Sequence, residues 1–217
     1  MPKTCLITGG SRGIGAATIE LLHRHKWNVI APTRVELDMT RAPSMVNNPA
    51  PLRRVGDLLD ALVFCHGVWS SGWLENHEYP HWNEQWTMRV YSPIQWIHRY
   101  LGALKNAAGC VVMVSSTRGF IGGVDTGPYS AACAAQIALM QGYAREYPGV
   151  KFNVVCPSLT ATDMEKQVRE TGGCKPDAIA QSPIVVAQTI VDLIESDANG
   201  KVMRVADGIA REAKWTW

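Results

Sequence analysis

Two hydroxyl-bearing side chains in the middle of the sequence could exchange a proton with an oxygen atom of a bound molecule. Ser116 follows an apolar run, and Tyr129 comes thirteen residues later, at the start of a helical pattern. A phenol and a hydroxyl that converge on one oxygen atom can act as its acid and fix its position. Each residue also has a simpler interpretation, Ser116 as the cap of a turn and Tyr129 as a packed aromatic. Taken singly these simpler interpretations prevail, so a catalytic role depends on further evidence, such as a ligand site elsewhere in the chain.

A glycine-rich segment near the N-terminus is the candidate for that site. Residues Thr8 to Gly15 read T-G-G-S-R-G-I-G and directly follow the apolar run Cys5–Ile7. Glycines let such a turn close with positive φ and let the backbone approach a ligand. The helix that follows offers N–H groups and the positive end of its dipole to an anion. A tight turn is the alternative, but the position directly after a strand favours a pyrophosphate site.

The composition is that of one globular domain, which we expect to span residues 1–217. Hydrophobic residues make up 47% of the chain and charged residues 18%, which is typical of a packed core rather than of a disordered chain. The net charge of +2 and the lack of a basic block argue against nucleic acid and anionic membranes as partners. No apolar run approaches the roughly 18 residues that a spanning helix needs.

The pattern of cysteines favours a reducing cytoplasm, and the spacing of the histidines predicts no metal site. The six cysteines are scattered without a C-x-x-C pair, and several lie in apolar runs, where a thiol packs as a small hydrophobic group. His66, His77 and His81 lack companions at a metal-ligand spacing. Together with the absence of a signal-peptide pattern, these features predict a cytoplasmic protein.

Short apolar runs alternate with helical patterns along the chain, which predicts an α/β fold with a Rossmann-like, doubly wound parallel sheet flanked by helices. The expected strands lie near Thr4–Thr8, Asn28–Pro32, Ala61–His66, Cys110–Ser115, Lys151–Cys156 and Val202–Ala206. The expected helices lie near Gly13–Lys26, Leu52–Leu59, Trp82–Asn106, Tyr129–Glu146 and Val185–Glu195. No crossover helix fits between Arg34 and Asp38. We therefore expect an abbreviated second crossover, with a short strand or extended loop around Val35–Leu37 and a surface loop at Arg41–Pro51.

These motifs and their order resemble the short-chain dehydrogenase/reductase family over nearly the whole chain. The segment Thr8–Gly15 is similar to the T-G-x-x-x-G-x-G cofactor loop of that family, and Phe64–Gly67 stands at its N-N-A-G motif, of which only the glycine is kept. Ser116 and Tyr129 have the spacing of its catalytic serine and tyrosine. Pro157–Thr162 is similar to its P-G-x-x-x-T segment, with a serine in place of the glycine.

The resemblance implies an oxidoreductase that transfers a hydride between a nicotinamide and a small carbonyl or alcohol substrate. It implies that Tyr129 exchanges the proton and that Ser116 holds the substrate oxygen. The residues that it assigns to the cofactor are Gly9, Ser11, Arg12, Gly13, Ile14, Gly15, Arg34, Asp38, Gly67, Tyr129, Pro157, Thr160 and Thr162. It further implies a substrate lid at Glu165–Ser182, and a homodimer or homotetramer that associates through the two long helices.

Two residues depart from the pattern of the family. Cys133 stands where the family has lysine, four residues after the tyrosine, and Arg89 stands at its helix asparagine. The lysine charge lowers the pKa of the tyrosine, by about two units at 5 Å. Cys133 is best interpreted as a small residue in helix packing. Arg89 could extend toward the space of the missing lysine and restore a cation beside Tyr129, as a third catalytic residue, or it could face solvent or a subunit contact.

These departures affect the direction of the reaction and leave a second class of function open. Without a nearby cation, the Tyr129 phenol should stay protonated near neutral pH. A protonated phenol can donate its proton to a developing alkoxide, whereas alcohol oxidation needs the phenolate, so we expect carbonyl reduction to be favoured. The alternative to a reductase is a cofactor-binding protein or regulatory subunit with little turnover.

The region after the second strand favours NADP(H) over NAD(H). The stretch Ala31–Arg34 lacks the acidic residue that binds a free ribose 2′-hydroxyl. Arg34 and Arg12 could flank a 2′-phosphate instead, although both could also be solvated surface charges. Asp38 is expected near the adenine or as the cap of a turn. For the substrate cleft, Trp69, Trp73 and Phe120 are candidates, with core or interface packing as the alternative.

Overall fold

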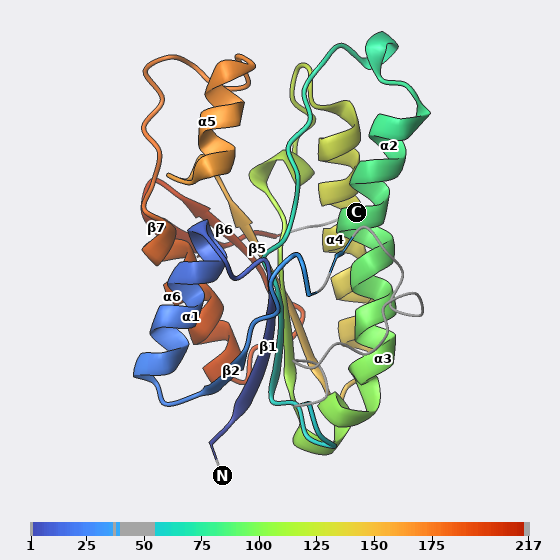
Figure 1. Cartoon of the computed structure of the whole chain (residues 1–217), viewed down its shortest axis with the longest axis vertical. Coiled ribbons are helices and arrows are strands. Elements are labelled where there is room, and N and C mark those ends of the chain that lie inside the picture. The colour runs from blue at the N-terminus through green and yellow to red at the C-terminus, as the bar shows by residue number, and fades with distance from the viewer. Residues whose placement is uncertain (1, 37, 40–54, 215–217) are drawn as a thin grey trace.

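A seven-stranded sheet forms the centre of the structure, with its strands in the order β2-β1-β3-β4-β5-β6-β7 (Figure 1). The computed structural model describes residues 2–36, 38–39 and 55–214. Strands β1 to β6 run parallel, and β7 is antiparallel to β6. The strand bounds are Thr4–Thr8 (β1), Asn28–Ile30 (β2), Ala61–Phe64 (β3), Cys110–Val114 (β4), Lys151–Pro157 (β5), Val202–Ala206 (β6) and Ile209–Glu212 (β7). The predicted α/β class with a parallel sheet is confirmed.

Each central strand is buried on both faces because its side chains alternate between two cores. In β1, Leu6 packs into the core on one face, and Cys5 and Ile7 pack into the core on the other. In β3, Phe64 packs into the same core as Leu6, and Val63 packs into the same core as Cys5 and Ile7. Successive side chains of a strand point to opposite faces, so a sheet covered by helices on both sides needs continuous apolar runs. This explains why the apolar runs located these strands.

Helices cover both faces of the sheet (Figure 1). Helices α1 and α6 contact one another on one face, and α3 and α4 lie on the other, with α2 continuing α3 beyond the end of the sheet. The helix bounds are Gly13–Arg24 (α1), Tyr79–Trp86 (α2), Ser92–Ala107 (α3), Gly127–Glu146 (α4), Asp163–Glu170 (α5) and Pro183–Glu195 (α6). Within the described part of the chain, no helix is both long and apolar enough to cross a membrane.

The single helix predicted at Trp82–Asn106 is wrong in one respect, because a π-helical turn interrupts it. This turn, Thr87–Tyr91 (η4), separates α2 from α3, and the Ser92 N–H bonds to the Thr87 carbonyl five residues back. Pro93 follows in the first turn of α3 and has no N–H to donate. A proline at this point removes a helical hydrogen bond, which accounts for the wider turn.

The connection from β2 to β3 differs from the sequence prediction in its described parts. Val55–Leu59 is not helical, so the helix predicted at Leu52–Leu59 is wrong over these residues. Where a short strand or an extended loop was predicted around Val35–Leu37, the described residues 34–36 form a turn, in which the Glu36 carboxylate accepts the backbone N–H of Thr33 at 2.8 Å. The surface loop predicted at Arg41–Pro51 lies outside the described residues.

Candidate active site

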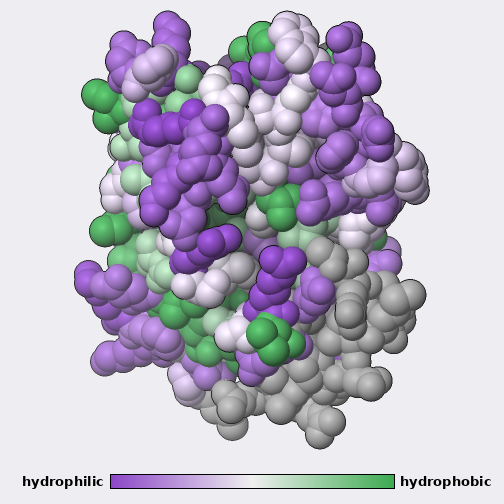
Figure 2. Space-filling model, turned by 45° about the horizontal axis from the view of Figure 1, so that its top comes forward, coloured by the Kyte–Doolittle hydropathy of each residue, from purple (hydrophilic) through white to green (hydrophobic). Residues whose placement is uncertain are grey.

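A pocket of about 980 Å³ opens at the carboxyl ends of the parallel strands. This is the edge at which open α/β sheets bind their ligands. Figure 2 shows this end of the molecule turned toward the reader: most of its visible surface is hydrophilic, and hydrophobic side chains form small separate patches. Of the predicted site residues, those that line the pocket are Gly9, Ser11, Arg12, Gly13, Ile14, Arg34, Asp38, Gly67, Arg89, Ser116, Tyr129, Pro157, Thr160 and Thr162. The pocket therefore brings together every residue predicted for catalysis or for the cofactor except Gly15.

The glycine loop between β1 and α1 is packed so closely that a side chain does not fit at its glycine positions. Gly9 has φ +71°, and a Cβ there would lie 2.5 Å from the His66 backbone nitrogen. A Cβ on Gly15 would lie 2.1 Å from the carbonyl oxygen of Gly9. Gly13 has φ +56° and lies against Thr162. The loop therefore presents bare backbone to the pocket, and Gly15 maintains its shape without lining the pocket.

Tyr129 lies on the floor of the pocket, near the start of α4, with its side chain almost fully buried. Its ring meets the Trp69 ring edge to face at 4.9 Å. Burial is the main cause that raises the pKa of the Tyr129 phenol to about 12, with Cys133 adding to it, while the Arg89 charge and a hydrogen bond with Ser116 lower it. Ser116 follows β4, and its hydroxyl accepts the Arg118 N–H at 3.1 Å. The phenol is therefore protonated at neutral pH and lies within reach of the Ser116 hydroxyl.

Arg89 is buried, with 3% of its surface exposed, and its side chain lies on the face of the Tyr129 ring. The guanidinium carbon is 4.3 Å from the ring centroid, within the range of a cation–π contact. Its Nε donates to Gln85 Oε1 at 3.1 Å, and its Nη2 donates to the Val68 carbonyl at 3.0 Å. Neutral acceptors thus hold a positive charge beside the phenol, and the solvent-facing alternative for Arg89 does not hold within this chain.

Cys133 is fully buried in α4, one turn after Tyr129. Burial raises the pKa of its thiol, so the thiol is uncharged at neutral pH. The hydroxyl of Ser115 donates to the Cys133 backbone carbonyl at 2.9 Å and ties α4 to the end of β4. The surroundings of Cys133 are therefore those of a residue in helix packing.

The cationic end of the pocket is formed by Arg12 and Arg34. Both side chains are largely exposed, and both line the pocket together with Asp38. Arg12 Nη1 pairs with Asp163 Oδ2 at 3.1 Å and so joins the glycine loop to the start of α5. Arg34 lies in the turn after β2. The two guanidinium groups therefore enter the pocket from different elements, and Arg12 also contacts the lid segment.

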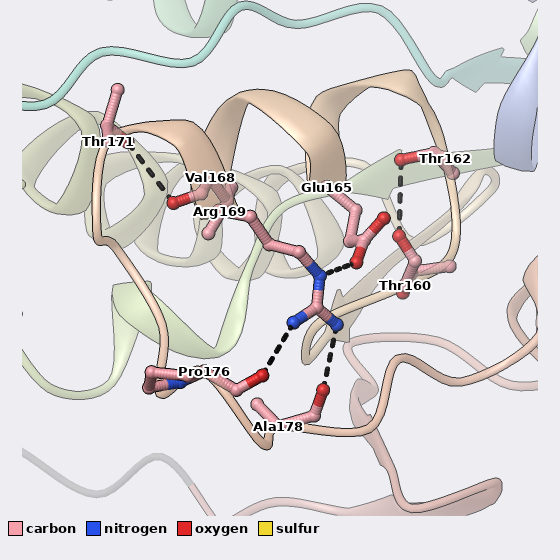
Figure 3. A network of polar contacts seen from close by, with 8 residues as sticks. All are labelled: Thr160, Thr162, Glu165, Val168, Arg169, Thr171, Pro176 and Ala178. Atoms are coloured by element: carbon pink, nitrogen blue, oxygen red, sulfur yellow. Dashed lines mark hydrogen bonds and ion pairs between the residues drawn. The ribbon is translucent and has the colours of Figure 1, made fainter.

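Helix α5 and the loop after it form the segment predicted as a lid (Figure 3). Within it, Arg169 pairs with Glu165 and donates to the carbonyls of Pro176 at 3.3 Å and Ala178 at 2.8 Å, so one side chain holds the helix to the loop (Figure 3). The segment starts at Asp163, two residues before the predicted start at Glu165.

Two side chains that line the pocket hold this segment in place. The Trp69 indole N–H donates to Thr171 Oγ1 at 3.0 Å, and Arg118 Nη2 donates to the Gly173 carbonyl at 3.1 Å. Trp69 and Phe120 line the pocket, as predicted for the substrate cleft, whereas Trp73 is 63% exposed and does not line it. Sequence reasoning missed Arg118, whose position two residues after Ser116 was the available signal.

Sequence reasoning also missed the contacts of His66. Its Nδ1 lies 2.7 Å from the Thr8 hydroxyl, and its Nε2 lies 2.8 Å from the Met88 carbonyl. Burial is the main cause that lowers the pKa of the His66 imidazole to about 4, with the Arg89 charge adding to it and the Met88 hydrogen bond opposing it. A neutral imidazole thus connects β1, the end of β3 and the π-helical turn.

The fold defines an α/β protein with a pocket at the carboxyl edge of its sheet. Residues 35–173 match the family model described as short chain dehydrogenase. The chain is 31% identical to the acetoacetyl-CoA reductase of Synechocystis sp. over 183 residues, which cover 77% of this chain and 76% of that protein. It is 28% identical to the 3-oxoacyl-[acyl-carrier-protein] reductase FabG of Vibrio harveyi, covering 95% of this chain and 97% of that one.

A solved structure has the same fold at lower sequence identity. The structure of ElxO with NADP bound superposes with a TM-score of 0.81 at 23% identity and covers 94% of this chain and 97% of the other. The matched family model and the identity to the Synechocystis reductase show that this chain belongs to the short-chain dehydrogenase family of oxidoreductases.

Proposed function

We propose that this protein is an NADP(H)-dependent reductase of small carbonyl compounds, an atypical member of its family in which Arg89 rather than a lysine supplies the cation near the phenol. The observation that carries the proposal is that Tyr129, Ser116 and Arg89 lie together in one pocket, which the glycine loop also lines. The names of the relatives support a reductase, and ElxO with NADP bound supports the cofactor.

The pocket residues fit a dinucleotide. The closely packed glycines leave bare backbone where a pyrophosphate needs to approach, and Ser11, Ile14 and the first turn of α1 can offer N–H groups to it. Arg34 and Arg12 can bind a ribose 2′-phosphate, with Asp38 toward the adenine. Gly67, Pro157, Thr160 and Thr162 border the space for the nicotinamide half, and when bound the reduced nicotinamide supplies the hydride.

The catalytic residues would then act on the carbonyl oxygen of the substrate. The Ser116 hydroxyl donates a hydrogen bond to that oxygen and fixes its direction. As negative charge develops on the oxygen, the Tyr129 phenol transfers its proton to it and leaves a phenolate. The Arg89 guanidinium on the ring face stabilises this phenolate electrostatically, because it lies 4.3 Å from the ring centroid in a buried site. Arg89 cannot transfer the proton itself, since a guanidinium stays protonated.

The first prediction concerns the pH dependence of the two directions. The pKa of Tyr129 is about 12, so the phenol is the dominant form at every pH below that value. Reduction, which uses the phenol, should change little between pH 6 and 9. Oxidation of the matching alcohol, which uses the phenolate, should rise about tenfold per pH unit in this range. Initial rates in both directions at saturating cofactor measure this, and equal pH slopes would contradict the assignment.

The second prediction concerns cofactor choice. Replacing Arg34 with alanine should weaken NADPH binding by about 10- to 100-fold, because a charge-assisted hydrogen bond contributes roughly 1.5–3 kcal/mol. Binding of NADH should stay within about twofold, because it lacks the phosphate. Fluorescence titration of both nucleotides measures the change. Arg145→Ala, in an exposed part of α4, is the matched control. An equal loss of affinity for NADPH and NADH in Arg34→Ala would mean that Arg34 does not bind the 2′-phosphate.

A cofactor-binding protein with little turnover is the second candidate, favoured by the buried, uncharged Cys133 and the high pKa of Tyr129. The experiment that separates the two is an NADPH titration followed by NADPH oxidation with aldehydes, ketones and 3-oxoacyl thioesters. Tight binding with no oxidation of NADPH by any of these compounds supports the second candidate. Turnover that depends on Tyr129 supports the reductase.

We further propose that residues 1–217 form a single dinucleotide-binding domain that acts in the cytoplasm as a homodimer or homotetramer. The support is the family resemblance, which gives α3 and α4 as the subunit contact. Light scattering of the purified protein tests the assembly, and a monomer at micromolar concentration would contradict it.

A further inference from the structure

We propose that His66 is a positioning residue, which holds the π-helical turn that carries Arg89 and so determines where the Arg89 guanidinium lies on the Tyr129 ring. The inference rests on the proposed function, because that function gives Arg89 its role beside the reacting phenol. In addition to that function, His66, the π-helical turn and Arg89 then form one structural unit beside the phenol.

The partners of His66 define its tautomer. The Met88 carbonyl can only accept, so the His66 Nε2 at 2.8 Å carries the proton and donates it. Nδ1 is then an acceptor, and the Thr8 hydroxyl at 2.7 Å donates to it. This arrangement requires a neutral imidazole, and burial lowers the pKa of His66 far enough to keep it neutral at physiological pH. Both ring nitrogens are therefore used, and the ring is fixed between β1 and the π-helical turn.

The Met88 carbonyl needs a donor from outside its own helix. In a regular α-helix it would accept the N–H of Ser92, but that N–H donates to Thr87 instead. In the wider π-helical spacing it would accept from Pro93, which has no N–H. A buried carbonyl without a donor is costly, and the His66 imidazole meets this need. The π-helical turn and the histidine thus depend on one another.

Arg89 directly follows Met88, and the residues next to His66 hold its side chain. Val68 accepts from Nη2 at 3.0 Å. A Cβ on Gly67 would lie 2.8 Å from the same Nη2, so the guanidinium lies directly over that glycine. The segment from His66 to Val68 therefore fixes both the backbone before Arg89 and the end of its side chain. Any shift of the Met88 carbonyl away from His66 moves the guanidinium relative to the Tyr129 ring.

A pair of amide substitutions separates the two hydrogen bonds of His66. Glutamine can reach the position of Nε2 and donate to Met88, whereas asparagine reaches only the position of Nδ1. We expect His66→Asn to lower kcat for carbonyl reduction by about tenfold, with KM and the dissociation constant of NADPH within about twofold of the parent. We expect His66→Gln to recover most of the lost rate. His23→Asn, at an exposed position of α1, is the matched control.

A double-mutant cycle decides whether His66 acts through Arg89. In an Arg89→Leu background, His66→Asn should cause no further loss of kcat, because two residues that act as one unit are non-additive. The same tenfold loss in both backgrounds would overturn the proposal. Loss of NADPH binding in His66→Asn and His66→Gln alike would overturn it too, since that result means a purely structural role next to Gly9.

Crystal structures of the variants without cofactor provide a readout that needs no turnover. The distance from the Arg89 guanidinium carbon to the Tyr129 centroid should stay near 4.3 Å in His66→Gln and increase in His66→Asn. An unchanged distance in His66→Asn contradicts the proposal even if activity falls. If the parent reduces no carbonyl compound, the proposed function fails while this distance still decides the role of His66.

Discussion

Replacement of Tyr129 by phenylalanine is expected to lower the rate of carbonyl reduction by about 10²- to 10⁴-fold and to leave NADPH binding nearly unchanged. The substitution removes only the hydroxyl, which is the group that donates the proton. The ring that packs against Trp69 at 4.9 Å and under the Arg89 guanidinium is retained, so the pocket should keep its shape. Stopped-flow measurement of hydride transfer and fluorescence titration of NADPH give the two quantities.

The control for this experiment is Tyr79→Phe. Tyr79 is 78% exposed at the start of α2 and does not line the pocket, so its hydroxyl should not affect the rate. If Tyr129→Phe turns over as fast as the parent, the proton comes from elsewhere and the assignment of Tyr129 is wrong. If it loses NADPH binding as well, the hydroxyl is needed for the shape of the pocket and the rate loss cannot be assigned to proton transfer.

Replacement of Gly15 by alanine is expected to weaken NADPH binding by about 10²-fold or more, although Gly15 does not line the pocket. The new Cβ would lie 2.1 Å from the Gly9 carbonyl oxygen and 3.0 Å from the Gly10 Cα, and neither backbone group can rotate away. The loop must therefore shift, and a misplacement of about 1 Å in a site of this kind can cost 10²-fold. Isothermal titration with NADPH measures the effect.

The matched control is Gly102→Ala in α3. A Cβ there meets nothing within 4 Å, and Gly102 is exposed in the interior of the helix. Alanine should stabilise the protein at that position by about 0.5–1 kcal/mol and leave NADPH binding unchanged. Equal affinity for NADPH in Gly15→Ala and the parent would mean that the loop does not hold the pyrophosphate.

The sequence predicted the central strands well because of how they are buried. Strands covered on both faces read as continuous apolar runs, and β1, β3, β4 and β5 are buried at nearly every residue. The same reasoning missed β7, since all of its residues are exposed. A signal was available there: Asp207-Gly208, with φ of +53° and +75°, is a dipeptide typical of a tight hairpin turn.

Helix α5 was missed for a similar reason. Only Val168 is buried in it, so it has no apolar stripe, although the acidic residues Asp163 and Glu165 in its first turn are typical of a helix start. Without a core to pack against, its position depends on polar contacts such as those of Trp69 with Thr171 and of Arg118 with Gly173, which join residues that sequence patterns do not relate.

The members of the candidate site were easier to predict than their contacts. Motif spacing was enough to name Ser116, Tyr129 and the glycine loop, whereas for Arg89 it gave a place beside Tyr129 only as one of two alternatives. Their catalytic and binding roles stay predictions. The contact of His66 with Met88 joins residues 22 positions apart and depends on a π-helical turn that the apolar periodicity of the helix did not indicate. Such contacts follow from the tertiary packing of particular elements, which no local pattern encodes.

The π-helical turn at Thr87–Tyr91 also determines in which direction the side chains of the following helix, α3, point. It holds one residue more than an α-helical turn, and each residue of an α-helix advances the chain by about 100° around the axis. Deleting one residue there would rotate α3 by that angle relative to α2 and carry Trp96, Ile97 and Leu104 away from the sheet, into which they are now buried. The one additional residue in this turn therefore sets both the inward direction of the Arg89 side chain and the direction in which the apolar side chains of α3 point.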